Sequence, residues 1–169
     1  VNTALGQPAL AATAFEFFAA RERATYGQFL SLTRRFLLDG TTAPDHPFWA
    51  ERGAPAPVDD RAAVLGAYDR IRAADRLTLR LSPAVTLAAR PALTERTIVL
   101  EERLVTPSIP EGLRYLDGVD VVALSRLVPG VSAVPDLFEA YGRASGKVDL
   151  PTFLKTLATA VARGWLLGV

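Results

Sequence analysis

The sequence predicts an α+β fold, in which a helical N-terminal part precedes a small three-stranded antiparallel sheet and three to four further helices. Two observations carry this prediction. Apolar residues recur at helical spacing through most of residues 8–74, and the spacing changes to strict alternation over residues 76–105 before helical spacing returns. The chain has 169 residues, half of them hydrophobic, which fits one compact domain or a small domain with a helical extension.

The composition excludes several classes of function. With 19 basic and 18 acidic side chains, the net charge of +1 gives no bulk attraction to nucleic acid or to a membrane surface. The chain has no cysteine, which excludes disulfides, thiol catalysis and cysteine–zinc sites. No run approaches the roughly 18 apolar residues of a membrane span, and the N-terminus lacks a secretory pattern, so we expect a soluble cytoplasmic protein without a membrane partner.

Residues 8–39 are expected to form one bent helix or two helices joined near Gly27. Pro8 suits a first helical turn, and Gly40 suits the position just after a last turn. Packing between helices is the expected role of the phenylalanines in this segment, and an aromatic ligand pocket is the alternative. The apolar stripe consists of Leu10, Ala14, Phe15, Phe17, Phe18, Phe29, Leu32, Phe36 and Leu37.

Residues 41–58 contain four prolines and little periodicity, which predicts a loop. Asp59 and Asp60 are candidate N-caps for a helix over residues 61–74. We therefore assign residues 1–75 to a helical N-terminal region and residues 76–169 to a second domain. The apolar stripe of the helix over 61–74 is Val64, Leu65, Tyr68 and Ile71.

Three short strands are expected after residue 76. Pro83 and Pro91 separate the runs and favour short or edge strands, and residues 90–96 are expected to form a hairpin turn. Glu102 falls on the apolar face of the third strand, which indicates either an edge where a partner docks or a local bulge. The residues that share a face are Leu77, Leu79 and Leu81 in the first strand, Val85, Leu87 and Ala89 in the second, and Ile98, Leu100 and Leu104 in the third.

Four helices and a final strand are expected after the sheet. The helices are predicted over residues 108–118, over 119–130 with a stop at Pro129, over 135–146, and from Leu150 to Gly164. On its polar face the last helix has only Lys155 and Arg163 as cations. The apolar stripe of this helix comprises Leu150, Phe153, Leu154, Leu157, Ala158 and Val161.

No constellation of catalytic side chains is found in the sequence. His46 has no second histidine or cysteine to complete a metal site or a triad. Glu101 and Glu102 are adjacent on a strand and therefore point to opposite faces. Ser125 and Ser145 have no base beside them in the sequence, and no glycine-rich phosphate loop occurs. We therefore expect no enzymatic activity, no metal and no cofactor bound by this chain.

A winged-helix transcription regulator that binds DNA is the alternative function. A helix that reads DNA combines polar residues that contact bases with several cations that contact phosphates. The last helix carries two cations, and the candidate wing at residues 91–96 adds Arg96 beside Glu95. This low charge argues against nucleic acid as a partner, because phosphate contacts supply most non-specific affinity.

Four stretches in the second half, "RLSPAV", "YLDG", "VPDLFEAY" and "FLKTLATAVARGWLL", occur in an order typical of one family. With them, residues 76–169 resemble the PqqD-like RiPP recognition element, a winged-helix module of ribosomal peptide natural-product pathways. With the preceding helices included, the chain is similar to partner subunits of multinuclear non-heme iron oxidative enzymes. The resemblance implies a winged-helix-like domain fused to a helical region that contacts the enzyme.

The resemblance also implies a function and a set of contact residues. It implies a non-catalytic partner protein that binds the leader region of a ribosomally made precursor peptide and presents it to a modifying metalloenzyme, in a hetero-oligomer, with any iron held by that enzyme. In such modules the leader adds as a strand beside the third strand and packs on the last helix. The matching peptide-binding positions are Thr97, Val99, Leu100, Glu102, Leu104, Thr152, Lys155, Thr156 and Thr159.

Overall fold

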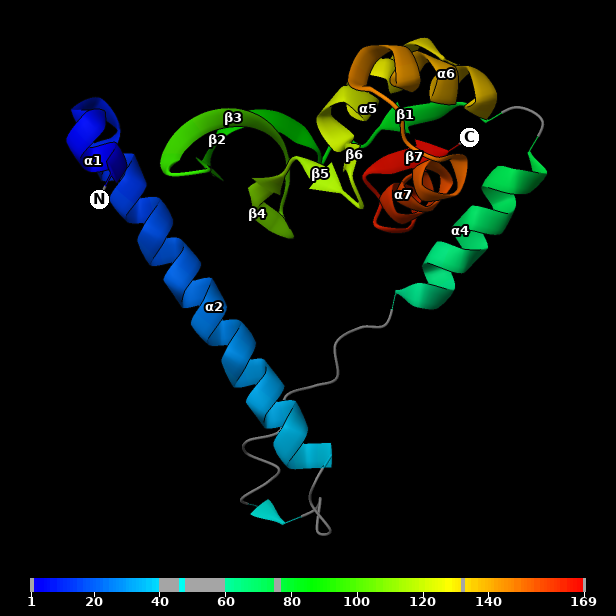
Figure 1. The fold of residues 1–169 in the computed structure, drawn as a ribbon. Helices are drawn as coiled ribbons and strands as arrows, with labels where there is room; N and C mark the ends of the chain where they lie inside the picture. The colour runs from blue at the N-terminus through cyan, green and yellow to red at the C-terminus, as the bar shows by residue number, and fades with distance from the viewer. Residues whose placement is uncertain (1, 40–45, 48–59, 75–76, 132, 169) are drawn as a thin grey trace. The chain divides into compact units, whose positions relative to one another are not determined.

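The structure is a computed structural model that describes residues 2–39, 46–47, 60–74, 77–131 and 133–168 (Figure 1). The chain forms two compact units, one of residues 1–58 with 93–99 and one of residues 59–92 with 100–169. The predicted α+β class is confirmed, because helices precede and follow a small antiparallel sheet along the chain. Apart from His46 and Pro47, the predicted loop at 41–58 lies outside the described residues. The division into 1–75 and 76–169 stays a prediction.

The first unit contains a long helix. A short helix α1 (Asn2–Gly6) and a 3-10 turn η1 (Pro8–Leu10) lead into α2 (Ala11–Asp39). Pro8 opens the 3-10 turn, where its fixed φ is favourable. Of the two alternatives for this segment, a break near Gly27 is not observed, since α2 continues through that residue. Thr3 is buried, and its Oγ1 accepts a hydrogen bond of 2.7 Å from the amide of Ile98 in the same unit.

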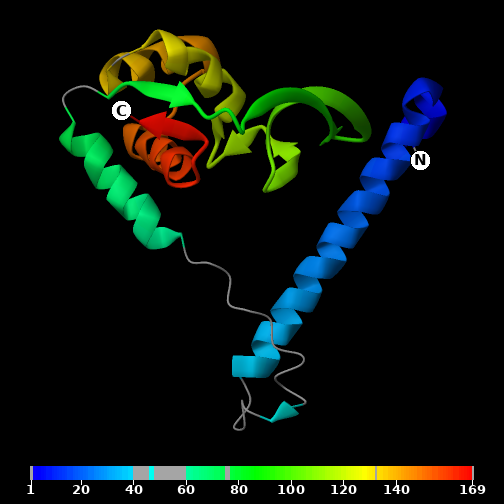
Figure 2. The ribbon, with the colours of Figure 1, turned by 180° about the vertical axis from the view of Figure 1, so that it is seen from behind.

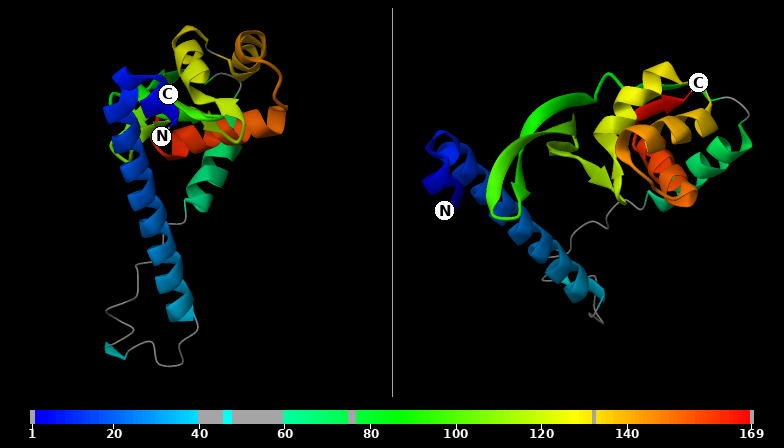
Figure 3. Two further views of the ribbon diagram at one scale, coloured as in Figure 1. Left: turned by 60° about the vertical axis from the view of Figure 1, so that its left-hand side comes forward. Right: turned by 45° about the horizontal axis from the view of Figure 1, so that its top comes forward.

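The main sheet consists of β2 (Thr86–Thr94), β3 (Thr97–Thr106) and β4 (Ile109–Leu113), with β3 in the centre. Figure 3 shows β2 and β3 as a curved pair of strands. The turn between them is shorter than the predicted turn at 90–96 and leaves only Glu95 and Arg96 outside the strands. Pro91 lies inside β2, and an edge strand tolerates proline because its outer amides need no partner strand.

Two further strand pairs complete the second unit. β1 (Leu79–Leu81) pairs antiparallel with β7 (Leu166–Gly168), and the two lie side by side in Figure 2. Residues 77–81 were predicted as part of the three-stranded sheet, and this assignment is wrong. The alternation of Leu79 and Leu81 fixes which face is buried, but it carries no information on the pairing partner. The place of the third strand is taken by β4, which pairs with β3.

The predicted helix over residues 108–118 is also wrong, because this segment forms β4 and then a hairpin of β5 (Tyr115–Leu116) and β6 (Val119–Asp120). Asp117 and Gly118 form its two-residue turn, with φ of 51° and 85°. Two positive φ values are what the preferred hairpin turn requires, and Asp-Gly is a favoured pair for it. This dipeptide between apolar residues is the signal that could have predicted the hairpin.

The remaining predicted helices are present. They are α4 (Arg61–Ala73), α5 (Val121–Leu127) with the 3-10 turn η2 (Val128–Gly130), α6 (Val134–Ser145) and α7 (Leu150–Ala162). Within the second unit α4 packs along α7, α5 packs on α6, and α7 contacts β7. None of the helices within the described ranges is both long enough and apolar enough to cross a bilayer.

The core of the second unit forms around Phe153 of α7, which is fully buried. Its ring centroid lies 5.2 Å from that of Phe138 and 5.4 Å from that of Tyr141, both on α6. Aromatic pairs at such separations add to the free energy gained by burying apolar area. The same cluster includes Ile71 of α4, Leu104 of β3 and Leu166 of β7, so it joins elements from the whole unit. This core fixes the orientation of α7, in which Lys155 is exposed while Thr156 and Thr159 are buried.

Candidate functional site

The polar face of α7 carries four of the predicted peptide-binding residues. Asp149 caps the helix, and its Oδ1 accepts a hydrogen bond of 2.9 Å from the Thr152 amide. Thr156 is buried, and its hydroxyl donates to the carbonyl of Leu116 at 3.3 Å. Thr159 is buried, and its hydroxyl donates to the Lys155 carbonyl at 2.9 Å. Lys155 is therefore the predicted residue of α7 whose side chain is most accessible to a partner.

A groove of about 630 Å³ lies beside this face of α7, and we call it the α4–α7 groove. Its walls come from α4, α7 and the β5–β6 turn. After Arg61 the α4 wall consists of Val64, Leu65 and Tyr68, and Leu65 remains 55% exposed. The residues that line the groove are Asp60, Arg61, Val64, Leu65, Tyr68, Leu116, Asp117, Pro151, Lys155, Thr159 and Arg163.

Two ion pairs bridge elements around the α4–α7 groove. Nζ of Lys155 lies 2.8 Å from Oδ2 of Asp117, and Nε of Arg163 lies 3.0 Å from Oδ2 of Asp60. Asp60 was predicted as a helix cap, but its side chain makes no cap hydrogen bond because it pairs with Arg163 instead. Exposed ion pairs of this kind contribute little to stability. Their effect here is to place both signs of charge beside an apolar surface.

The predicted residues of the third strand lie in a different environment. Leu104 is buried in the core, and the register of β3 against β4 shifts between Leu104 and Thr106. This shift lies beyond Glu102, so both alternatives for that residue stay predictions. Leu100 is exposed. Before it, the outer amide of Ile98 is already bonded to Thr3. The free edge expected for strand addition is therefore restricted to the backbone near Leu100.

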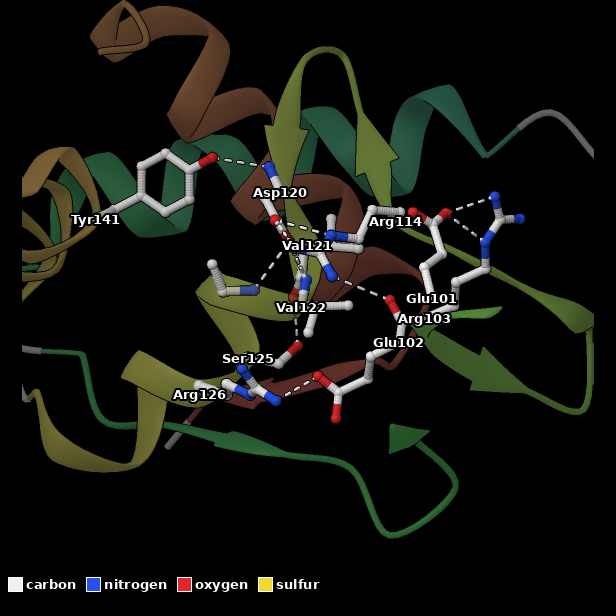
Figure 4. Close-up of polar contacts among 11 residues, drawn as sticks. Glu101, Glu102, Arg103, Arg114, Asp120, Val121, Val122, Ser125, Arg126 and Tyr141 are labelled. Atoms are coloured by element: carbon white, nitrogen blue, oxygen red, sulfur yellow. Dashed lines mark hydrogen bonds and ion pairs between the residues drawn. The ribbon is translucent and has the colours of Figure 1, made fainter. Parts of the chain in front are cut away.

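Glu102, which interrupts the apolar face of β3, belongs to a network of charged groups (Figure 4). Its carboxylate pairs with Arg126 of α5, and its carbonyl accepts a hydrogen bond of 3.2 Å from Nη1 of Arg114. Arg114 also contacts Oδ2 of Asp120, with Nε at 2.9 Å and Nη2 at 2.6 Å. The second carboxylate oxygen of Asp120 caps α5. The network thus connects the middle of β3 to both ends of α5.

The hydroxyl of Tyr141 closes this network on its buried side. The amide of Asp120 donates a hydrogen bond of 2.7 Å to it (Figure 4). Burial raises the pKa of this hydroxyl, and the hydrogen bond from the Asp120 amide opposes that shift. The hydroxyl therefore stays protonated near neutral pH and acts as a structural acceptor.

Within the second unit, the predicted peptide-binding residues lie in more than one place. Lys155 and Thr159 line the α4–α7 groove, whereas Leu100, Glu102 and Leu104 do not. The remaining two strand residues, Thr97 and Val99, belong to the first unit. The sequence analysis missed the opposite wall of the groove on α4. The helical stripe of α4 was visible in the sequence, but no local pattern indicates that α4 packs against α7. In the part of the chain that the structure describes, no three His, Cys, Asp or Glu side chains gather as metal ligands.

Comparison with known proteins shows a similarity in fold. No protein-family model matches the chain, and no curated protein matches it. Over 96% of its length the chain is similar to the solved structure of QhpG, a peptidyl tryptophan dihydroxylase essential for tryptophylquinone cofactor biogenesis, with a TM-score of 0.54 and 24% sequence identity. The chain spans 33%, about a third, of the length of that protein.

This similarity corrects one expectation from the sequence. We expected a chain without enzymatic activity, but the solved protein that shares its fold is an enzyme. The expectation depended on finding a complete set of catalytic groups within 169 residues, whereas the matching region is a third of that enzyme. A module can belong to an enzyme without holding every reacting group itself. The PqqD-like resemblance has no family match and stays a prediction.

Proposed function

We propose that this chain is the polypeptide-binding part of an enzyme that modifies a side chain within a polypeptide, and that the polypeptide binds in the α4–α7 groove. The observation that carries the proposal is the groove itself, an open apolar surface between two helices with paired charges around it. The similarity in fold to an enzyme named for its action on a peptidyl tryptophan supports the substrate class.

The shape of the α4–α7 groove favours a polypeptide over a small molecule. Small-molecule sites are concave and place a few polar groups inward. In the described residues, every buried side-chain nitrogen or oxygen already has a hydrogen-bond partner. None of these atoms is therefore left to bind a small ligand. An apolar groove between helices instead suits a segment with apolar side chains at regular spacing. Lys155 and Asp117 can then exchange their ion pair for contacts with charged residues of that segment.

We further propose that the bound segment is the leader region of a ribosomally made precursor peptide. Lys155 and Thr159 contact it from the side of α7 indicated by the sequence. Strand addition beside β3 contributes backbone hydrogen bonds only near Leu100. The amide of Ile98 is already bonded to Thr3, and the carbonyl of Glu102 is already bonded to Arg114. The groove therefore supplies most of the contact surface.

Titration of a peptide tests this proposal. Linear peptides selected from a displayed random library against the whole chain serve as probes, with fluorescence anisotropy as the measurement. We expect Leu65→Glu and Lys155→Glu each to weaken binding by about tenfold or more, a loss of about 1.4 kcal/mol. Leu65→Glu places a new charge against the bound segment, and Lys155→Glu reverses an existing charge. Both side chains are exposed, so the fold is retained.

Leu150→Glu is the matched control. Leu150 lies on α7, is 45% exposed and does not line the α4–α7 groove. A carboxylate in the first turn of a helix is also tolerated. We expect the affinity of this variant to equal that of the unaltered chain. Equal affinities for all four proteins, or an equal loss in the control, would contradict the proposed site.

The DNA-binding alternative predicts a different result. Both cations on the polar face of α7 are paired with carboxylates, which lowers the positive potential that a phosphate backbone would meet. Binding of duplex DNA that weakens steeply as salt rises would favour a transcription regulator over the proposed function. We expect no such binding.

A further inference from the structure

The exposed face of α2 is an apolar surface that the proposed function does not use. From Phe18 to Phe36 every side chain of this helix is exposed. An exposed helix of this length is marginal in water on its own, and Gly27 in its middle lowers its stability further. Apolar patches of this kind mark interaction surfaces. Its large exposed apolar side chains are Phe15, Phe18, Tyr26, Phe29, Leu30, Leu32 and Phe36.

The spacing of these residues is that of a helix-pairing seam. If Phe15 is placed at position a of a seven-residue repeat, Phe18 falls at d, Phe29 at a, Leu32 at d and Phe36 at a. Apolar residues at a and d form the narrow stripe along which two helices interlock their side chains. The central a and d positions of the seam are polar and hold Glu22 and Thr25. The seam therefore has two apolar halves separated by one polar layer.

From this pattern we infer that α2 pairs in antiparallel orientation with α2 of a second copy of the chain. In the antiparallel register that places Glu22 opposite Thr25, Phe18 lies opposite Phe29 and Phe15 lies opposite Leu32. In this register the apolar side chains of one seam contact apolar side chains of the other, and the polar side chains contact polar ones. A two-fold symmetric interface requires this self-complementarity.

The polar residues of the seam fix this register. A polar side chain at an a position costs stability but specifies alignment, because a shifted register would bury it against an apolar partner. A parallel pair would place Glu22 against Glu22, two like charges at the seam. In the antiparallel pair the flanking Arg21 lies nearest the neutral Gln28 of the other copy, so no like charges meet there.

Sedimentation velocity of the whole chain over a range of concentrations tests the pairing. We expect a dimer whose dissociation constant rises by about tenfold or more in Leu32→Glu, which places a charge in the seam. Leu30→Glu is the matched control, because Leu30 lies on α2 outside the seam. Leu32 and Leu30 are 54% and 37% exposed, so neither change disturbs a core. A chain that stays monomeric, or a dimer weakened equally by both variants, overturns the inference.

Disulfide crosslinking tests the orientation independently. The chain has no cysteine, so each introduced cysteine reports on a single position. Chains with Glu22→Cys are mixed with chains that carry Thr25→Cys and then oxidised. The antiparallel pair predicts mostly the mixed disulfide, because these two positions face each other. Crosslinks formed mainly between identical chains would contradict the antiparallel pair, and circular dichroism of both variants checks that α2 remains helical.

Discussion

Asp120 and Asp149 perform the same local task in different surroundings. Each precedes a helix and accepts hydrogen bonds from the amides of its first turn. Asp120 is buried. Its carboxylate caps α5 and pairs with Arg114, while its backbone amide donates a hydrogen bond to the Tyr141 hydroxyl. Asp149 is exposed, and the Thr152 amide, with a smaller contribution from the Thr152 hydroxyl, lowers its pKa. The stability of α7 therefore depends on pH through the carboxylate of Asp149.

The lowered pKa of Asp149 predicts how the stability of the unit changes with pH. A carboxyl group with a lower pKa in the folded state stabilises the fold at pH values above its unfolded pKa, and this contribution is lost as the pH falls through the folded pKa. Asp149→Asn keeps a capping oxygen but cannot titrate there, so its free energy of unfolding should depend less on acid. Urea unfolding from about pH 2 to pH 7 measures the difference. Identical pH profiles for the two proteins would contradict this role.

At the scale of elements, the β5–β6 hairpin positions one wall of the α4–α7 groove. Asp117 contributes a charge to the groove from within the turn, and Leu116 accepts the hydrogen bond of Thr156. The backbone of the turn depends on Gly118, whose φ of 85° is unfavourable for a residue with a side chain. The turn conformation therefore determines where Asp117 meets Lys155.

Replacement of Gly118 tests this dependence. Gly118→Ala should lower the free energy of unfolding by about 1–2 kcal/mol because the new side chain strains the turn. Gly66→Ala is a suitable control, since Gly66 lies inside α4 and a Cβ there meets nothing within 4 Å. We expect the control to gain up to about 1 kcal/mol from better helix propensity. Chemical denaturation of both variants measures these free energies. An unchanged free energy of unfolding for Gly118→Ala would show that the turn tolerates a side chain.

Much of this local structure follows from sequence patterns, and the exceptions have physical causes. The four helices from α4 to α7 follow from apolar spacing, because that signal lies within each segment. The assignment of a helix to residues 108–118 failed because the Asp-Gly turn outweighs the helical pattern around it. Lys155 and Thr159 were predicted site residues that line the groove. Leu65 also lines the groove but was not predicted as a site residue, because a contact between helices far apart in the sequence leaves no local signal.

At the scale of the molecule, the second unit depends on a core in which Phe153 contacts two rings of α6. Residues from α4, β3, α5, α6, α7 and β7 meet in this cluster, so its loss affects every element that lines the α4–α7 groove. The helical surfaces on opposite sides of the groove thus share one source of stability. A change at the core should therefore alter binding through the fraction of folded protein.

Phe153→Ala measures this dependence. Removal of a fully buried phenylalanine should lower the free energy of unfolding by about 3–5 kcal/mol, from the lost apolar burial and the cavity that remains. Phe138→Ala serves for comparison, because Phe138 is only partly buried and should cost less. Denaturant unfolding monitored by tryptophan fluorescence gives both values, since Trp165, one of the two tryptophans, is buried in the same core. A loss below about 1 kcal/mol for Phe153→Ala would contradict this account.

The pairing of β1 with β7 has a consequence for synthesis on the ribosome. Leu79 is paired with Gly168, so the first strand of the second unit obtains its partner from the last described residues. Until residues 166–168 have left the exit tunnel, the edge of β1 has no partner and Trp165 cannot reach the core. Such long-range closure is slow compared with helix formation. Completion of this unit therefore waits until residues 166–168 have left the tunnel, and the nascent chain must keep β1 from aggregating until then.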